Sequence, residues 1–285
     1  MPTESDIGQL PSMGVLRFSG PDAVNFLQGQ LSNDLQRLSA RQLLFAGLHN
    51  PQGRVIALLL LTRTADTDVI ALLPAALAAS VAQRLRRFVL RARVTISDES
   101  GAWSVTGATD EAARRLLADD SAVQWPGASA RVCLLQPMAG VVAPEPAADF
   151  AQRWQLLNIA DGIPRVDVFN SEQYIAQMLN LDCIDAVSFD KGCYTGQEII
   201  ARAHYRGRVK RRMQRFLSAS ACTVQAGDSL TLRDGRDAAV VDALLHADGR
   251  SEFLAVATWP LPADLAECAD GLRCTALPLP YGLPQ

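Results

Sequence analysis

The sequence lacks paired cysteines, a histidine cluster and a long hydrophobic run. Its six cysteines stand apart at positions 133, 183, 193, 222, 268 and 274, and no two form a Cys-x-x-Cys pair. The three histidines are too widely spaced for a zinc site. We therefore expect no metal site. We also expect no disulfide framework, and a reducing, cytoplasmic location.

Signals for membrane insertion and secretion are also missing. The longest apolar run, residues 55–61, is far shorter than the roughly 20 residues that cross a bilayer, so we interpret it as a buried strand. The first six residues, MPTESD, are polar and acidic and lack the basic and apolar regions of a signal peptide. We expect no membrane partner.

Nucleotide-binding glycine loops are absent too, because neither GxGxxG nor GxxxxGK[ST] occurs. What the chain does have is an ordinary globular composition. It has 285 residues, of which 49% are hydrophobic and 20% charged, with a net charge of −3. This length is enough for two domains, each with its own core.

Predicted strands and helices alternate without a regular βαβ repeat, which favours an α+β fold. Ser19 is predicted to cap a helix that follows the first strand. The later turn signals AGD, RDG and ADG separate short apolar runs and predict a small antiparallel β-barrel or sandwich. We therefore expect an α+β region of two interleaved subdomains over residues 1–215 and a C-terminal barrel over 216–285. The predicted strands cover residues 15–18, 43–48, 54–63, 68–73, 94–96, 103–106, 131–135 and 140–142, and the predicted helices cover 74–91, 110–118 and 150–159.

Basic residues are concentrated in one stretch that contains no acid. Such a strip attracts a phosphate, a polyglutamate tail or RNA. It is equally typical of a solvated helix end followed by an edge strand, where arginines suppress unwanted pairing. The members are Arg202, Arg206, Arg208, Lys210, Arg211, Arg212 and Arg215.

The stretch Asp190 to Glu198, DKGCYTGQE, combines a thiol, an amine and two glycines. Thr195 and Glu198 match a capping box, which predicts a helix start just after Cys193. A helix N-terminus and the nearby Lys191 both favour a thiolate at Cys193.

Several interpretations of Cys193 remain open on these residues alone. A nucleophile needs a base, and the only histidine near in sequence is His204. A metal ligand needs neighbours that this spacing does not supply. A small cysteine buried in the core needs no function, and on these residues alone this interpretation is favoured over a redox-sensitive thiol.

The same stretch resembles the signature of the YgfZ family, folate-binding proteins linked to iron–sulfur cluster assembly and to tRNA modification. The family is related to the glycine cleavage T-protein, an aminomethyltransferase. The resemblance covers most of the chain. It rests on residues 191–198 with Ala201-Arg202 and Tyr205-Arg-Gly207, and on residues 26–34 (FLQGQLSND), 48–54 (LHNPQGR), 158–164 (NIADGIP), 180–182 and 279–281.

The resemblance implies three subdomains in a ring around a central channel that holds tetrahydrofolate, with Cys193 near it as a reactive thiol beside Lys191. Trp154 stands where the family tends to place an aromatic near the folate, although core packing explains it equally well. An aromatic surface suits the pterin, and arginines suit the acidic tail. The other residues expected to bind the cofactor are Gly192, Tyr194, Gly196, Gln197, Glu198, Arg202 and Arg206.

The chain also departs from its relatives. The T-protein carries acids after its hairpin glycine, whereas Gly53 is followed here by RVIAL. Ala160 stands near the position of the T-protein's pterin-contacting glutamate, with Asp161 adjacent, and Ala176 replaces the family's usual proline.

We therefore expect an accessory protein rather than a classical enzyme, one that binds tetrahydrofolate and supports iron–sulfur client enzymes, among them radical-SAM enzymes that modify tRNA. It would reach tRNA only through such clients. The alternatives are a folate-dependent one-carbon transferase and a module that binds RNA directly through the basic stretch.

Overall fold

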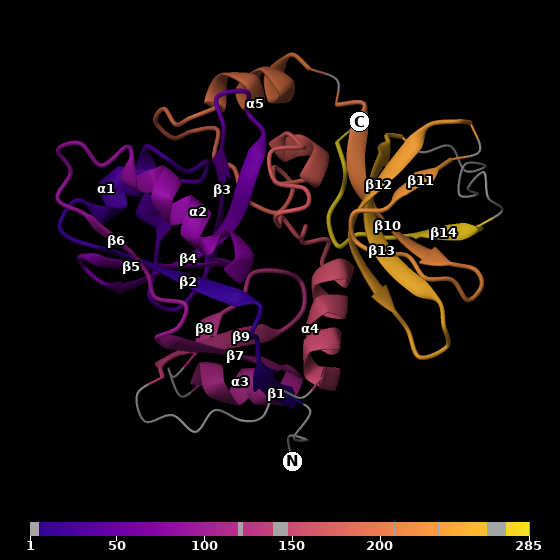
Figure 1. The fold of residues 1–285 in the computed structure, drawn as a ribbon, viewed down its shortest axis with the longest axis horizontal. Coiled ribbons are helices and arrows are strands. Elements are labelled where there is room, and N and C mark those ends of the chain that lie inside the picture. Colours follow the sequence, from indigo (N-terminus) through magenta and orange to yellow (C-terminus); the bar gives the residue numbers. More distant parts are fainter. Residues whose placement is uncertain are drawn as a thin grey trace.

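Three antiparallel sheets and five α-helices make up the part of the chain that this computed structural model describes (Figure 1). That part covers residues 6–118, 122–138, 148–207, 209–232, 234–260 and 272–284. Helices pack on antiparallel sheets and no parallel βαβ unit is present among these residues, so the predicted α+β class is confirmed.

The first sheet has the strand order β3-β4-β5-β2-β6. Its members are β2 (Met13–Ser19), β3 (Leu44–His49), β4 (Val55–Ala65), β5 (Asp68–Pro74) and β6 (Thr95–Asp98). The predicted hairpin is confirmed, since β3 and β4 pair antiparallel. The predicted buried strand is confirmed too, because every residue from Val55 to Thr62 is buried.

Two helices accompany this sheet, α1 (Ala23–Gln28) and α2 (Ala75–Arg86). Leu77, Val81 and Leu85 form the buried stripe of α2. Ser19 does not cap α1, because β2 continues through Ser19 and the cap position is Asp22. The side chain of Asp22 accepts a hydrogen bond from the backbone N–H of Arg93 instead.

The second sheet has the order β1-β7-β9-β8. Its strands are β1 (Ile7–Gln9), β7 (Trp103–Thr109), β8 (Val123–Gln124) and β9 (Arg131–Pro137), accompanied by α3 (Asp110–Ala118) and α4 (Ala148–Ala160). Helix α4 lies between this sheet and the third one and contacts both (Figure 1). The strand predicted over residues 140–142 lies outside the described residues.

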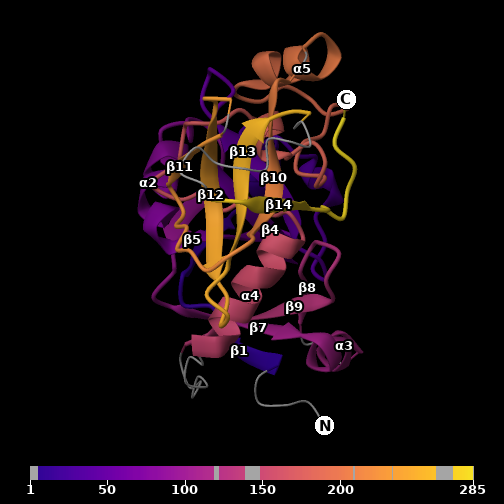
Figure 2. The same cartoon turned by 90° about the vertical axis from the view of Figure 1, so that its right-hand side faces the viewer.

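The third sheet has the order β11-β12-β13-β10-β14 and lies face-on in Figure 2. Its strands are β10 (Arg211–Ser218), β11 (Ser229–Thr231), β12 (Asp237–Leu245), β13 (Ser251–Thr258) and β14 (Cys274–Leu277). The prediction of a closed barrel is wrong for the described residues, because β11 and β14 do not pair with each other and the sheet stays open. Turn signals predict hairpins, but closure depends on whether the two edge strands meet.

Residues 161–190 connect the three sheets without forming a strand or an α-helix. One 3-10 turn, Ala176–Leu179, interrupts them. Asn33 of the first region donates to the carbonyl of Asp185, and Asn180 donates to the carbonyl of Met213 in the third sheet. Because these bonds satisfy buried backbone groups, the irregular segment is held as firmly as a regular element.

The described residues include no helix that is both long enough and apolar enough to cross a membrane.

The ion pair between Arg212 and Asp182 ties the irregular segment to β10 and is almost fully buried, with side-chain exposures of 4% and 6%. We expect Asp182→Asn to lower the free energy of unfolding by about 3 kcal/mol, because it leaves a buried guanidinium without its counter-charge. Urea unfolding measures this. Asp185→Asn is the matched control: its pair with Arg37 is exposed (63% and 49%), so we expect a loss below about 1 kcal/mol. Equal losses in the two variants would contradict the argument.

Candidate functional site

The principal candidate site is a cavity of about 400 Å³ bordered by residues from the regions of all three sheets. Leu58 and Leu60 of β4 line it from the first sheet, Trp125 follows β8 of the second, and Asp242 comes from β12 of the third. Helix α4 and the segment after it complete the wall with Trp154, Gln155, Asn158 and residues 163–167. A mostly apolar cavity with a few polar groups is typical of a small-molecule site.

Trp154 belongs both to this cavity and to the core. Its ring is 4% exposed, packs edge-on against Trp125 at 5.0 Å and lies 5.9 Å from Phe150. Gly107 of β7 makes room for it, because a Cβ there would lie 2.7 Å from the ring. Core packing and a place in the cavity wall are therefore compatible for Trp154, since its ring packs on other aromatic rings and the residue also lines the cavity.

A buried arginine supports the two tryptophans. The guanidinium carbon of Arg131 lies 4.9 Å from the centre of the Trp154 ring and 5.7 Å from that of Trp125. Nη2 pairs with Asp161 at 2.7 Å and Nη1 donates to Asn158 at 2.7 Å. Burial lowers the pKa of Arg131 to about 10, although Asp161 opposes the shift, so the guanidinium stays charged at neutral pH.

Asp161 therefore points away from any ligand. Besides Arg131, its carboxylate accepts hydrogen bonds from the hydroxyl and the backbone N–H of Ser129. With all these partners, it serves to fix the arginine beneath the aromatic wall. No local sequence pattern predicts this arrangement, because Arg131 and Asp161 belong to segments far apart in the chain.

Asp242 is the carboxylate that lies in the cavity wall without a cationic partner of its own. It is 2% exposed, and β12 carries a bulge between Val240 and Asp242. Oδ1 accepts from Gln155 Nε2 at 2.7 Å. Burial raises the pKa of Asp242 to about 6, against the effects of Gln155 and Arg165. A lone acid in the apolar run AAVVDALL was the sequence signal for this residue, and our sequence analysis missed it.

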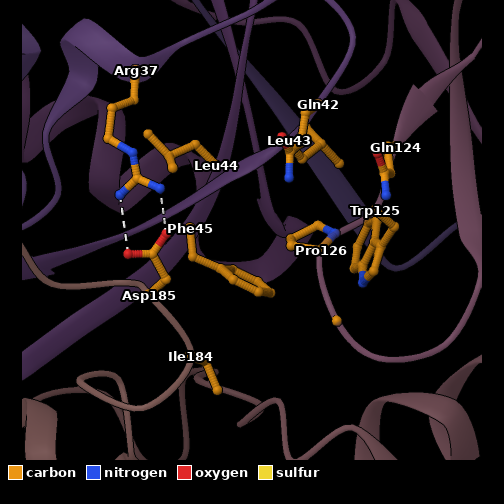
Figure 3. Close-up of a pocket in the computed structure, with 11 residues that line it drawn as sticks. Arg37, Gln42, Leu43, Leu44, Phe45, Gln124, Trp125, Pro126, Ile184 and Asp185 are labelled. Atoms are coloured by element: carbon orange, nitrogen blue, oxygen red, sulfur yellow. Dashed lines mark hydrogen bonds and ion pairs between the residues drawn. The ribbon is translucent and has the colours of Figure 1, made fainter.

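A second cavity of about 320 Å³ shares Trp125 with the first (Figure 3). The amides of Gln42 and Gln124 line one end, and the Arg37–Asp185 ion pair lines another. Trp125 lines both cavities, and its Nε1–H is buried with no hydrogen-bond partner among the described residues.

The signature stretch lies elsewhere, at the end of the molecule marked by α5 (Gln197–Tyr205) in Figure 1. Cys193 is exposed. No residue from Lys191 to Arg206 lines either cavity, so the structure does not bring the signature residues together with Trp154. Their predicted roles in catalysis and cofactor binding stay predictions. Three of them, Glu198, Arg202 and Arg206, have exposed side chains.

The predicted capping box is wrong. Helix α5 begins at Gln197 with Gly196 as its cap, and no side chain caps it. Gly196 adopts φ +82°, which brings its backbone against the hairpin turn: a Cβ there would lie 2.5 Å from the carbonyl oxygen of Asn50 and 3.0 Å from Gly53. This glycine-to-glycine contact, rather than Thr195, sets where the helix starts.

The ammonium group of Lys191 is hydrogen-bonded to backbone carbonyl groups. Its ammonium donates to the carbonyl oxygens of Gln28 and Leu31, both at 2.6 Å, and lies 5.1 Å from the centre of the Tyr194 ring. Burial lowers the pKa of Lys191 to about 8, with Asp34 opposing. The amine therefore holds the end of α1, where carbonyl groups favour a cation, and it makes no hydrogen bond to Cys193.

His204 makes no hydrogen bond to Cys193 and is therefore not placed as its base. Its ring stacks on Phe189, with the ring centres 3.7 Å apart and an interplanar angle of 17°. Among the residues that the structure describes, none forms a nucleophile–base pair with the Cys193 thiol.

The basic stretch does not form one exposed strip. Arg212 is buried against Asp182, Arg215 pairs with Glu252, and Arg211 donates to two backbone carbonyls. The edge-strand interpretation is also wrong, because β10 lies between β13 and β14 inside its sheet. Arg202, Arg206 and Lys210 remain exposed, and Arg208 lies outside the described residues.

Comparison with known proteins identifies the family. The chain is 32% identical over 300 residues to the tRNA-modifying protein YgfZ of Edwardsiella ictaluri, a match that spans 95% of this chain and 90% of that protein. The chain belongs to the YgfZ family of tRNA-modifying proteins. The YgfZ protein of Enterobacter sp. is 29% identical over 305 residues, covering 97% and 93% of the two chains. No protein-family model matches the sequence.

The fold of this YgfZ-family chain is that of the T-protein. It superimposes on the crystal structure of glycine cleavage system aminomethyltransferase T from Bartonella henselae with a TM-score of 0.69, covering 88% of this chain and 77% of that one. Sequence identity is 15%, so this likeness establishes the fold alone. The resemblance predicted from the signature and its neighbouring segments is confirmed.

The contact between the signature and the hairpin gives a test. Gly196→Ala places a side chain at positive φ and into the Asn50 carbonyl, so we expect the free energy of unfolding to fall by about 2 kcal/mol or more. Gly192→Ala is the matched control, because nothing lies within 4 Å of a Cβ at that position. We expect a change within about 0.5 kcal/mol there. Denaturant unfolding of both variants measures these free energies. An unchanged free energy of unfolding in Gly196→Ala would show that the contact is dispensable.

Proposed function

We propose that this protein binds a tetrahydrofolate in the larger cavity and supports the assembly or repair of iron–sulfur enzymes, including radical-SAM enzymes that modify tRNA. The observation that carries the folate part is the cavity bordered by the three sheets of a T-protein-like fold, with Trp125 and Trp154 in its wall. The iron–sulfur part rests on membership of the YgfZ family.

The residues present suit a folate. Two tryptophan rings and several aliphatic side chains provide surfaces for a flat pteridine and a benzoyl ring. Two groups in the wall have unused hydrogen-bonding capacity, the Nε1–H of Trp125 and the carboxylate of Asp242. Arg165 lines the same cavity with a half-exposed side chain, where it suits the carboxylates of the glutamate tail.

The one-carbon transferase has less support. After Gly53 the chain enters β4, which carries no acid from Val55 to Ala65. The proton transfers that such chemistry needs are therefore not provided from the hairpin, where the related enzyme has its acids. Direct RNA binding is also less favoured, because several arginines of the basic stretch are buried or paired.

Tetrahydrofolate binding is tested by titrating the purified protein while following tryptophan fluorescence. We expect saturable binding, with a Kd that rises at least tenfold in Trp154→Phe because the smaller ring offers less surface to the ligand. Trp259→Phe is the matched control: Trp259 bonds to the carbonyl of Pro284 and does not line the cavity, so its Kd should equal that of the wild type. Absence of binding by the wild type would refute the folate proposal.

The role of the thiol is tested in cells. Cys193 is exposed, so an oxidant or a client protein has access to it. We expect Cys193→Ala to reduce the activity of client iron–sulfur enzymes under oxidative stress, whereas Cys222→Ala, which packs against the core of the third sheet, should retain it at equal protein levels. Unchanged client activity in Cys193→Ala would remove the thiol from the mechanism.

A further inference from the structure

Asp242 is an unusual residue for the wall of an apolar cavity. It reaches the cavity from β12, at a bulge that changes the register of the strand against β13, and its side chain is almost completely buried. An ionised carboxylate in such surroundings loses its hydration, and this destabilises the protein unless other groups compensate. A carboxylate retained in this position needs an explanation.

Its hydrogen bonds compensate only one of the two oxygens. Oδ1 accepts from Gln155 Nε2 and from the backbone N–H of Ala243. Within the described part of the chain, Oδ2 accepts no hydrogen bond. The nearby Arg165 is paired with Asp167 at 2.8 Å and makes no hydrogen bond to Asp242. Gln155 therefore fixes the orientation of the carboxylate and leaves one oxygen for a ligand.

We propose that Asp242 binds the edge of the pteridine that carries the ring N3–H and the 2-amino group. This inference rests on the proposed function and names the group that recognises the ligand's head. That edge presents two neighbouring donors, and the free Oδ2 of Asp242 accepts from it, since each oxygen of an ionised carboxylate has two lone pairs. The other parts of a folate fit less well, because the benzoyl ring has no comparable donor pair and the glutamate tail is itself negative.

The position of Asp242 also accounts for the cavity's composition. Trp125, Trp154 and the aliphatic residues of β4 offer contact to the ring faces but no acceptor for its donors. Asp167 is the other carboxylate in the wall, and Arg165 already neutralises it. Of the two carboxylates in the cavity wall, Asp242 is thus the one with free acceptor capacity. Because Asp242 lies on the third sheet, a ligand bound to it links that sheet to the aromatic wall.

The test compares two folates and two variants of the full chain by calorimetry at pH 7.5. The ligands are 5-formyltetrahydrofolate and its 2-desamino-2-methyl analogue, which lacks the amino donor. We expect Asp242→Asn to raise the Kd of the first ligand about 10- to 100-fold, the range for losing hydrogen bonds to a charged group. The analogue should bind weakly to the wild type and lose no more than about threefold further in the variant.

Asp237→Asn is the matched control, since it removes a carboxylate from an exposed position of the same strand, β12, outside the cavity. We expect its Kd for 5-formyltetrahydrofolate to stay within about threefold of the wild type. A Kd that is unchanged in Asp242→Asn while the wild type binds would overturn this inference and leave the proposed function intact. No binding by any form of the protein would overturn both.

A second measurement applies if Asp242→Asn does not fold. The wild-type Kd is followed from pH 7.5 to pH 5. The groups that face Asp242 are Gln155, which does not titrate, and the Arg165–Asp167 pair. Because burial raises its pKa to about 6, Asp242 gains a proton in this range and loses acceptor capacity. We expect affinity for 5-formyltetrahydrofolate to fall severalfold below pH 6, and a flat profile would contradict the proposal.

Discussion

A buried backbone without regular secondary structure must find hydrogen-bond partners elsewhere, and in this protein residues 161–190 find them in the regions of the first and third sheets. Tyr281 donates to the carbonyl of Gly162, Arg212 to that of Gln177, and Ser32 to that of Ala186. Each bond ties the irregular segment to one of these two regions. The arrangement of the sheets, and hence the cavity they border, depends on this set of polar contacts as much as on apolar packing.

Two buried charged residues, Arg131 and Asp242, differ in how completely their charge is compensated by partners. Arg131 is paired with Asp161 and hydrogen-bonded to Asn158, so it holds the tryptophan wall in place without being available to a ligand. Asp242 has its orientation fixed by a neutral amide and keeps one oxygen unused. A paired charge supports the site, and an incompletely paired one is the natural place for recognition.

The cavity and the signature stretch are separate features connected by packing. The signature docks on the hairpin turn through Gly53 and Gly196, and Lys191 anchors it to the end of α1. This docking leaves Cys193 at the surface while the tryptophans lie inside. A folate in the cavity and a partner protein at the thiol would therefore occupy different places, and the first sheet, whose β4 lines the cavity and whose hairpin turn holds the signature, connects them.

The sequence by itself determined the local elements and the family. The apolar run of residues 55–61, the helix of residues 110–118 and the contiguous signature are each properties of a short stretch. Short stretches are enough to predict a strand, a helix or a family relationship. Tertiary structure decided the rest, because it depends on contacts between distant residues. The sheet of the C-terminal region stays open because its edge strands do not meet, and α5 starts after Gly196 because that glycine meets Gly53. Arg131 and Asp242 are buried and hydrogen-bonded by residues that lie far away in the chain. Only the folded protein brings those residues together, so no single segment predicts what either charge does.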